Sequence, residues 1–79
     1  MERTQIFAKV QDILIDKYGT SDVELTEETN MVETFGLDSL DSVELVMAIE
    51  TEFDIKVDDD EATEMITVKS AIDIIEKKV

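Results

Sequence analysis

The chain has 79 residues, of which 43% are hydrophobic, and it carries a formal net charge of -14 with no Cys and no His. This length predicts one small domain over residues 1–79 with little room for a catalytic cleft, and the missing Cys and His exclude disulfides, thiolate chemistry, the usual zinc ligands and the commonest general base. The charge disfavours nucleic acids and anionic membranes, and no apolar run approaches the roughly 20 residues that span a bilayer, so we expect a cytoplasmic protein without membrane insertion whose partners are basic.

The first predicted element is a helix near the N-terminus. Thr4 is its expected cap and Gly19 its expected stop, because glycine readily adopts the left-handed conformation that ends helices. Apolar residues recur at helical spacing between them, namely Ile6, Val10, Ile13, Leu14 and Tyr18.

The next segment, from Gly19 to Asp38, is mostly polar and sustains neither a helical nor a strand period. We therefore expect a long loop, which is uncommon in a compact domain unless it has a function. Scattered apolar side chains should hold it against the domain, and these are Val23, Leu25, Met31, Val32, Phe35 and Leu37. No Lys or Arg occurs between Tyr18 and Ile55, so a partner that docks there meets a negative field.

The strongest predicted helix runs from Ser39 to Phe53. Asp38 is its expected N-cap, and Asp41 three residues on completes a carboxylate version of the capping box. Asp54 follows as a polar exit.

Two further helices are expected toward the C-terminus. Residues 58–65 allow no more than two turns, whereas Val68, Ala71, Ile72 and Ile75 repeat at helical spacing behind Thr67 as a cap. Lys77 and Lys78 then stand at a helix end, where cations are favourable. The absence of Pro and of strand-like alternation predicts an all-α fold, a small bundle of three main helices plus one short helix, with the long loop between the first two.

Ser39 is the candidate functional residue, because at the first position of a helix capped by Asp38 its hydroxyl is free. A serine at a helix start is by itself commonplace. Here it belongs to the run FGLDSLDSVEL at residues 35–45, which resembles the phosphopantetheine attachment signature of acyl carrier proteins, typically Leu-Gly-x-Asp-Ser-Leu followed by acids. The resemblance extends through residues 46–50, 52–54 and 68–73, and so covers most of the chain.

This resemblance implies that a phosphopantetheinyl transferase attaches 4'-phosphopantetheine from coenzyme A to Ser39, and that the thiol of the arm holds acyl chains as thioesters. It implies a monomeric carrier, not an enzyme, that serves acyl-transferring and fatty acid synthesis enzymes. The composition agrees, because no Cys can form a thioester and no His can activate Ser39. Carriers for polyketide, peptide or alanyl transfer are the alternatives, and the residues 36–40 resemble the bacterial fatty acid type.

One face of the 39–53 helix is acidic and the other apolar. Basic patches of partner enzymes should dock on the acidic face, although acids on a helix can equally be a solvated surface and the apolar residues at its border ordinary core. Such electrostatics raise association rates and select partners. The expected docking residues are Asp38, Leu40, Asp41, Val43, Glu44, Met47, Glu50 and Glu52. The family often has a further acid where this chain has Thr51.

The apolar side chains of the later helices should form the core, namely Leu45, Val46, Ile49, Phe53, Ile66, Ala71, Ile72 and Ile75. The resemblance implies that an acyl chain enters between the helices. The predicted acyl pocket therefore comprises Leu45, Val46, Ile49, Phe53, Ile66, Ala71 and Ile72. A plain packed core explains the same residues without any ligand.

Two other classes of function compete with a carrier. Residues 54–64 are dense in carboxylates, but a calcium loop of the EF-hand kind needs Gly at its sixth position and Glu at its twelfth, and counting from Asp54 these are Asp59 and Met65. We expect no specific metal site, only weak stabilisation by magnesium or calcium. An acidic interaction module would share the charge and the bundle but would leave the Ser39 hydroxyl without a role.

Overall fold

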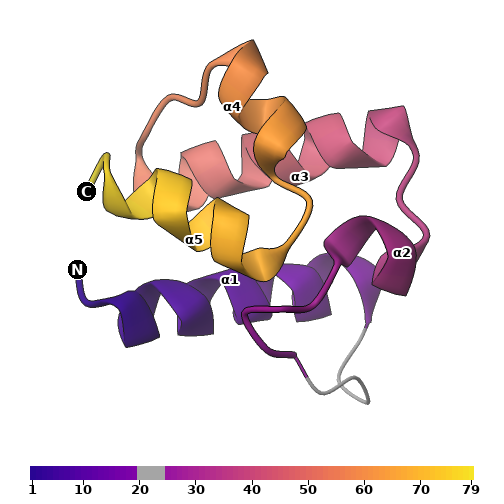
Figure 1. Ribbon diagram of the computed structural model, residues 1–79, viewed down its shortest axis with the longest axis horizontal. Coiled ribbons are helices and arrows are strands. Elements are labelled where there is room, and N and C mark those ends of the chain that lie inside the picture. The colour runs from indigo at the N-terminus through magenta and orange to yellow at the C-terminus, as the bar shows by residue number, and fades with distance from the viewer. Residues whose placement is uncertain (20–24) are drawn as a thin grey trace.

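A computed structural model describes residues 1–19 and 25–79, and five helices account for most of this part (Figure 1). They are α1 (Arg3–Tyr18), α2 (Met31–Phe35), α3 (Ser39–Phe53), α4 (Asp59–Glu64) and α5 (Val68–Glu76). Within the described ranges no strand occurs, and a single antiparallel bridge joins Asn30 to Thr67. The all-α fold with three longer helices is confirmed.

Helix α1 begins two residues earlier than predicted. Glu2 is the N-cap, and the Gln5 side chain accepts a hydrogen bond from the Glu2 backbone N–H at 2.9 Å. The prediction that Thr4 caps the helix is wrong, because the capping box of Glu2 and Gln5 places the cap two residues nearer the N-terminus. Gly19 ends the helix as predicted, with φ of 63° and its N–H donating to Ile15 O at 2.8 Å.

The predicted long loop contains a short helix, α2, that the sequence reasoning missed. Asn30 caps it by accepting from the Glu33 N–H at 2.9 Å, and Gly36 ends it with φ of 63°. Five residues are too few to show a helical period, whereas the Asn and Gly at its two ends are a recognisable signal. Val23, expected to anchor this loop, lies outside the described residues.

The two other predicted caps are confirmed. The Asp38 carboxylate accepts from the Asp41 N–H at 2.8 Å at the start of α3. Thr67 Oγ1 accepts from the Ser70 N–H at 3.1 Å at the start of α5. Asp54 ends α3 in the left-handed region, with φ of 53°.

The core lies between the longer helices, and α5 packs along α1 (Figure 1). It includes Leu45, Ile49, Phe53, Ala71, Ile72 and Ile75 as predicted, together with Ile6, Val10, Leu14, Met31, Val68 and Ile74. Ile66 was expected in this core and is 45% exposed instead. Its backbone oxygen accepts from the Met31 N–H at 2.7 Å in the connection before α5, and its side chain lies outside the core. Val46 is only half-buried.

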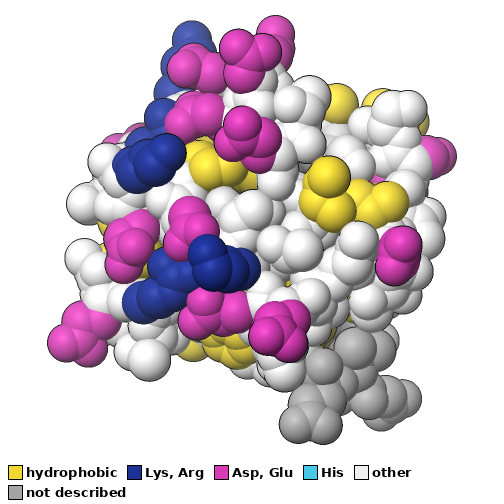
Figure 2. Space-filling model, in the orientation of Figure 1, with side chains coloured by type: hydrophobic (Ala, Val, Ile, Leu, Met, Phe, Trp, Pro, Cys, Tyr) yellow, Lys and Arg dark blue, Asp and Glu magenta, His cyan; other side chains and the backbone are white. Residues whose placement is uncertain are grey.

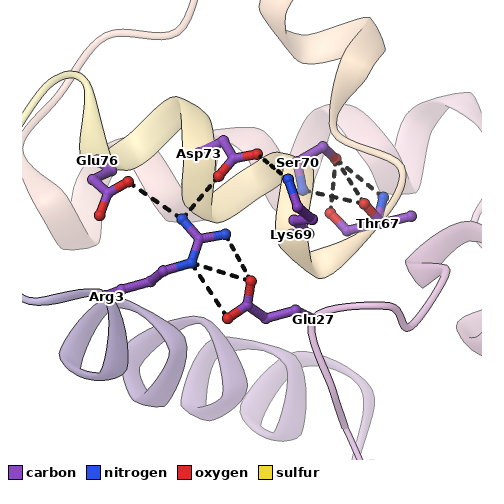
Figure 3. A network of polar contacts seen from close by, with 7 residues as sticks. All are labelled: Arg3, Glu27, Thr67, Lys69, Ser70, Asp73 and Glu76. Atoms are coloured by element: carbon purple, nitrogen blue, oxygen red, sulfur yellow. Dashed lines mark hydrogen bonds and ion pairs between the residues drawn. The ribbon is translucent and has the colours of Figure 1, made fainter.

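Arg3 ties three segments together by ion pairs (Figure 3). Its guanidinium lies 2.7 Å from Glu27 in the connection before α2, and 2.8 Å from Asp73 and 3.3 Å from Glu76 in α5. Hydrogen bonding to Arg3 lowers the pKa of Glu27, and the pKa of Asp73 is lowered first by Lys69 and then by Arg3. The start of α1 is thus joined to α5 by charge as well as by packing.

Candidate functional site

Ser39 stands at the first position of α3, and its residue is exposed. The first N–H groups of any α-helix have no partner within the helix. The Asp38 side chain accepts from the Asp41 N–H, and the Asp38 backbone oxygen accepts from the Ser42 N–H. The N–H groups of Ser39 and Leu40 have no hydrogen-bond acceptor among the residues that the structure describes. An anion joined to the Ser39 hydroxyl therefore meets free donors and the positive end of the helix dipole.

Local structure before Ser39 fixes where the serine lies. Gly36 ends α2, Leu37 is buried, and the Leu37 N–H donates to Val32 O at 3.0 Å. Asp38 then caps α3. Residues 36–38 form the short connection between α2 and α3 (Figure 1), and Ser39 follows it as the first residue of α3.

Apolar side chains beside Ser39 face solvent. Leu40 is 67%, Val43 55% and Met47 58% exposed. The alternative that these residues are ordinary core is therefore wrong. Large apolar side chains so exposed on a small domain are typical of protein contact surfaces.

The acids expected to dock partners differ in their exposure to solvent. Asp38, Glu44 and Glu52 are exposed, and Asp41 is half-buried. Glu50 is engaged inside the molecule, because its carboxylate accepts from the Val57 N–H at 2.8 Å and so holds the connection from α3 to α4. Its availability to a partner is lower than that of the exposed acids. No sequence pattern distinguishes such a carboxylate from its neighbours.

A hollow of about 590 Å³ lies between α3 and α4, with Ser39 on its rim. Of the predicted acyl pocket, Leu45, Val46 and Ile66 line it. Ile49, Phe53, Ala71 and Ile72 are buried in the core and do not line it. Lining residues that the sequence reasoning did not name for the pocket include Val43, Met47, Val57, Ala62 and Met65. Helical periodicity marks a buried face but cannot show where two packed helices leave a gap.

A second, shallower groove lies on the other side of α3, between it and α1, and has a volume of about 770 Å³. Glu44, Met47 and Glu52 line it from α3, and Asp12 and Asp16 from α1. The sequence reasoning did not include the α1 acids in the docking surface. Their spacing of four residues was the available signal, since it places both on one side of the helix.

Charges are distributed unevenly over the surface. On the face shown in Figure 2, Lys and Arg lie in the left part and the centre of the view, while the right side, which carries the start of α3, shows none. This matches the stretch without basic residues between Tyr18 and Ile55. The surface around Ser39 is therefore apolar and acidic.

Neither a metal site nor a membrane-spanning helix occurs in the described ranges. Across residues 1–19 and 25–79, no three carboxylate, His or Cys side chains come together as a metal site would require. Among the helices of this part, none is long and apolar enough to cross a bilayer.

The chain matches known proteins along almost its whole length. The family described as the phosphopantetheine attachment site matches residues 8–75. The acyl carrier protein of Thermotoga maritima is 43% identical over 77 residues, which cover 98% of this chain and 95% of that protein. The acyl carrier protein of Guillardia theta is 42% identical over 79 residues, with 100% and 98% covered.

Solved structures agree with the sequences. The crystal structure of the Thermotoga maritima acyl carrier protein has a TM-score of 0.81 at 37% identity, covering 99% of this chain and 91% of that one. The acyl carrier protein of Enterococcus faecalis also gives 0.81, at 28% identity, with both chains covered completely. The chain belongs to the acyl carrier protein family, whose prosthetic group is 4'-phosphopantetheine.

Proposed function

We propose that this chain is a non-catalytic carrier whose Ser39 holds 4'-phosphopantetheine, and that it serves fatty acid synthesis. The observation that carries the proposal is the exposed hydroxyl of Ser39 at the head of α3, on the rim of an apolar hollow. When bound, the arm supplies the thiol that the chain lacks and holds an acyl group as a thioester.

Residues of this chain would hold the phosphopantetheine arm and shelter the acyl chain that it carries. Ser39 Oγ offers the attachment atom, and the N–H groups at the start of α3 favour the phosphate joined to it. An apolar chain that enters the hollow between α3 and α4 leaves water, which is favourable in proportion to the apolar area buried. Val43, Val46 and Ala62 offer such contacts.

Partner recognition falls to the surface beside Ser39. Leu40, Val43 and Met47 offer exposed apolar contacts, and Asp38, Glu44 and Glu52 surround them with negative charge. A phosphopantetheinyl transferase and the acyl-transferring enzymes of fatty acid synthesis would dock here through basic patches. The electrostatic attraction raises the association rate more than it raises affinity.

Membership of the acyl carrier protein family supports the assignment to fatty acid synthesis. Relatives named acyl carrier protein match the chain along almost its whole length. Fatty acid synthesis is therefore favoured over polyketide, peptide or alanyl transfer. A cytoplasmic location and a monomeric state are part of the same proposal.

Loading the protein step by step tests the proposal. Coenzyme A and a phosphopantetheinyl transferase should add one arm, seen by intact mass. Fatty acyl or malonyl groups from their transferring enzymes should then load onto the arm. A wild-type chain that takes no arm would overturn the carrier function. An arm that only an alanine ligase can load would indicate alanyl transfer in place of fatty acid synthesis.

A further inference from the structure

Ser39 is not held by its own side chain. In the part of the chain that the structure describes, no side-chain hydrogen bond involves Ser39. The segments on either side of the serine therefore set its position. These are the end of α2 and the first turn of α3, joined by residues 36–38.

Helix α2 cannot hold its place alone. It has five residues, and Met31 at its start is its one buried residue. That start is fixed by the Met31 N–H, which donates to Ile66 O at 2.7 Å, and by the bridge from Asn30 to Thr67. The other end, which leads into Ser39, is followed by buried Leu37 and gains a further contact from α1.

Tyr18, in the last turn of α1, supplies that contact. Its ring stacks on Phe35 at the end of α2, with centroids 5.6 Å apart and ring planes 14° from parallel. Its hydroxyl donates a long hydrogen bond of 3.5 Å to the backbone oxygen of Asp41, in the first turn of α3. One half-buried side chain thus contacts both segments that flank Ser39.

We propose that Tyr18 and Phe35 form an aromatic brace that positions Ser39 for modification, so that Tyr18 acts as a positioning residue for attachment of the arm. The inference rests on the proposed function, because it concerns the same serine. Burial raises the pKa of Tyr18, and the carboxylates of Asp41 and Glu44 raise it further, which keeps the phenol protonated and able to donate.

Steady-state kinetics of arm attachment test the brace. With a phosphopantetheinyl transferase and coenzyme A, Tyr18→Leu and Phe35→Leu should each lower kcat about tenfold, because a reacting atom misplaced by a fraction of an ångström slows the chemical step. KM should change little, since the docking surface is untouched. Tyr18→Phe keeps the stacking and should retain most of the rate.

Phe7→Leu is the matched control, because Phe7 is also a half-buried aromatic residue of α1. It should lose stability without losing kcat. Equal kcat in wild type and Tyr18→Leu, or an equal loss in Phe7→Leu, would overturn the brace. A wild type that takes no arm would instead overturn the carrier function, so the two failures are distinguishable.

Fluorescence gives a second test that needs no brace variant. Tyr18 is the only Tyr of the chain, which has no Trp, so tyrosine emission reports on this residue alone. Attachment of the arm should change that emission in wild type, whereas Ser39→Ala incubated in the same way should show no change. An emission unaltered by complete modification would contradict the coupling between Tyr18 and Ser39.

Discussion

The side built from α1 and α5 and the side built from α3 and α4 differ in how they are held together. Helix α5 buries five of its nine residues, and Arg3 pairs with Asp73 and Glu76 beside it. Helix α4 has no fully buried residue, and a hollow separates it from α3. Both sides contribute to the core, because Leu45, Ile49 and Phe53 of α3 are buried as well. The second side also leaves apolar side chains and space free for partners and cargo.

Core truncation should give the largest effect and should separate the buried core from the exposed face of α3. Ile72 is fully buried in α5, so Ile72→Ala should lower the free energy of unfolding by about 3 kcal/mol. Val43→Ala on the exposed face of α3 should change it by less than about 0.5 kcal/mol. Urea denaturation measures both, and equal losses would contradict the distinction between the core and the exposed face of α3.

Charge reversal beside Ser39 should come next. Glu44→Lys should slow association with the phosphopantetheinyl transferase about tenfold at low salt, because it reverses the attraction that steers the encounter. Glu28→Lys makes the same change in net charge in the connection that runs beside the start of α5, and should have little effect. Stopped-flow measurements of the association rate would compare the two variants with wild type. Rates independent of salt in wild type would argue against electrostatic docking.

Filling the hollow with a larger side chain should prevent the acyl chain from being buried there. In acylated wild type, each methylene buried should add at most about 0.8 kcal/mol, so Tm should rise with chain length. Val46→Phe should flatten that rise, because Val46 lines the hollow. Ile13→Phe enlarges a half-buried residue that lines the other groove and serves as control. A rise equally steep in Val46→Phe would place the acyl chain elsewhere.

The Arg3 network should give the smallest effect, and pH should reveal it. The pKa of Glu27 and that of Asp73 are lowered in the folded state from ordinary values of 4.5 and 3.8. Their contribution is therefore complete above these values and is lost as pH falls through the lowered pKa values. The Tm difference between wild type and Arg3→Ala should be present at neutral pH and vanish in acid.

Lys9→Ala is the control for charge, because Lys9 lies over the ring of Phe53, 5.9 Å from its centroid, and not against a carboxylate of the Arg3 network. Its Tm difference from wild type should not depend on this acid window. A difference for Arg3→Ala that persists unchanged in acid would show that the ion pairs contribute nothing.

Local signals explain why so much of the fold could be predicted. Asp38 with Asp41, and Thr67 before an apolar period, each define a helix start by backbone hydrogen bonds within a few residues. Helix α2 was missed because five residues carry no period, and its caps were read as loop residues.

The site divides in the same way. Ser39 could be proposed as the attachment residue because its motif is local. Other features depend on contacts between distant segments, which spacing along the chain does not encode. They are the exposure of Ile66, the hydrogen bond from the Val57 N–H to Glu50, and the set of residues that lines the hollow. The acids of α1 join the α3 surface for the same reason.

Intact mass after incubation with coenzyme A and a phosphopantetheinyl transferase tests the central claim most directly. Ser42 lies one turn from Ser39 and lines the same hollow, so Ser42→Ala is the matched comparison. Wild type and Ser42→Ala should each gain the mass of one arm, and Ser39→Ala should gain none. An arm on Ser39→Ala, or none on wild type, would contradict the account.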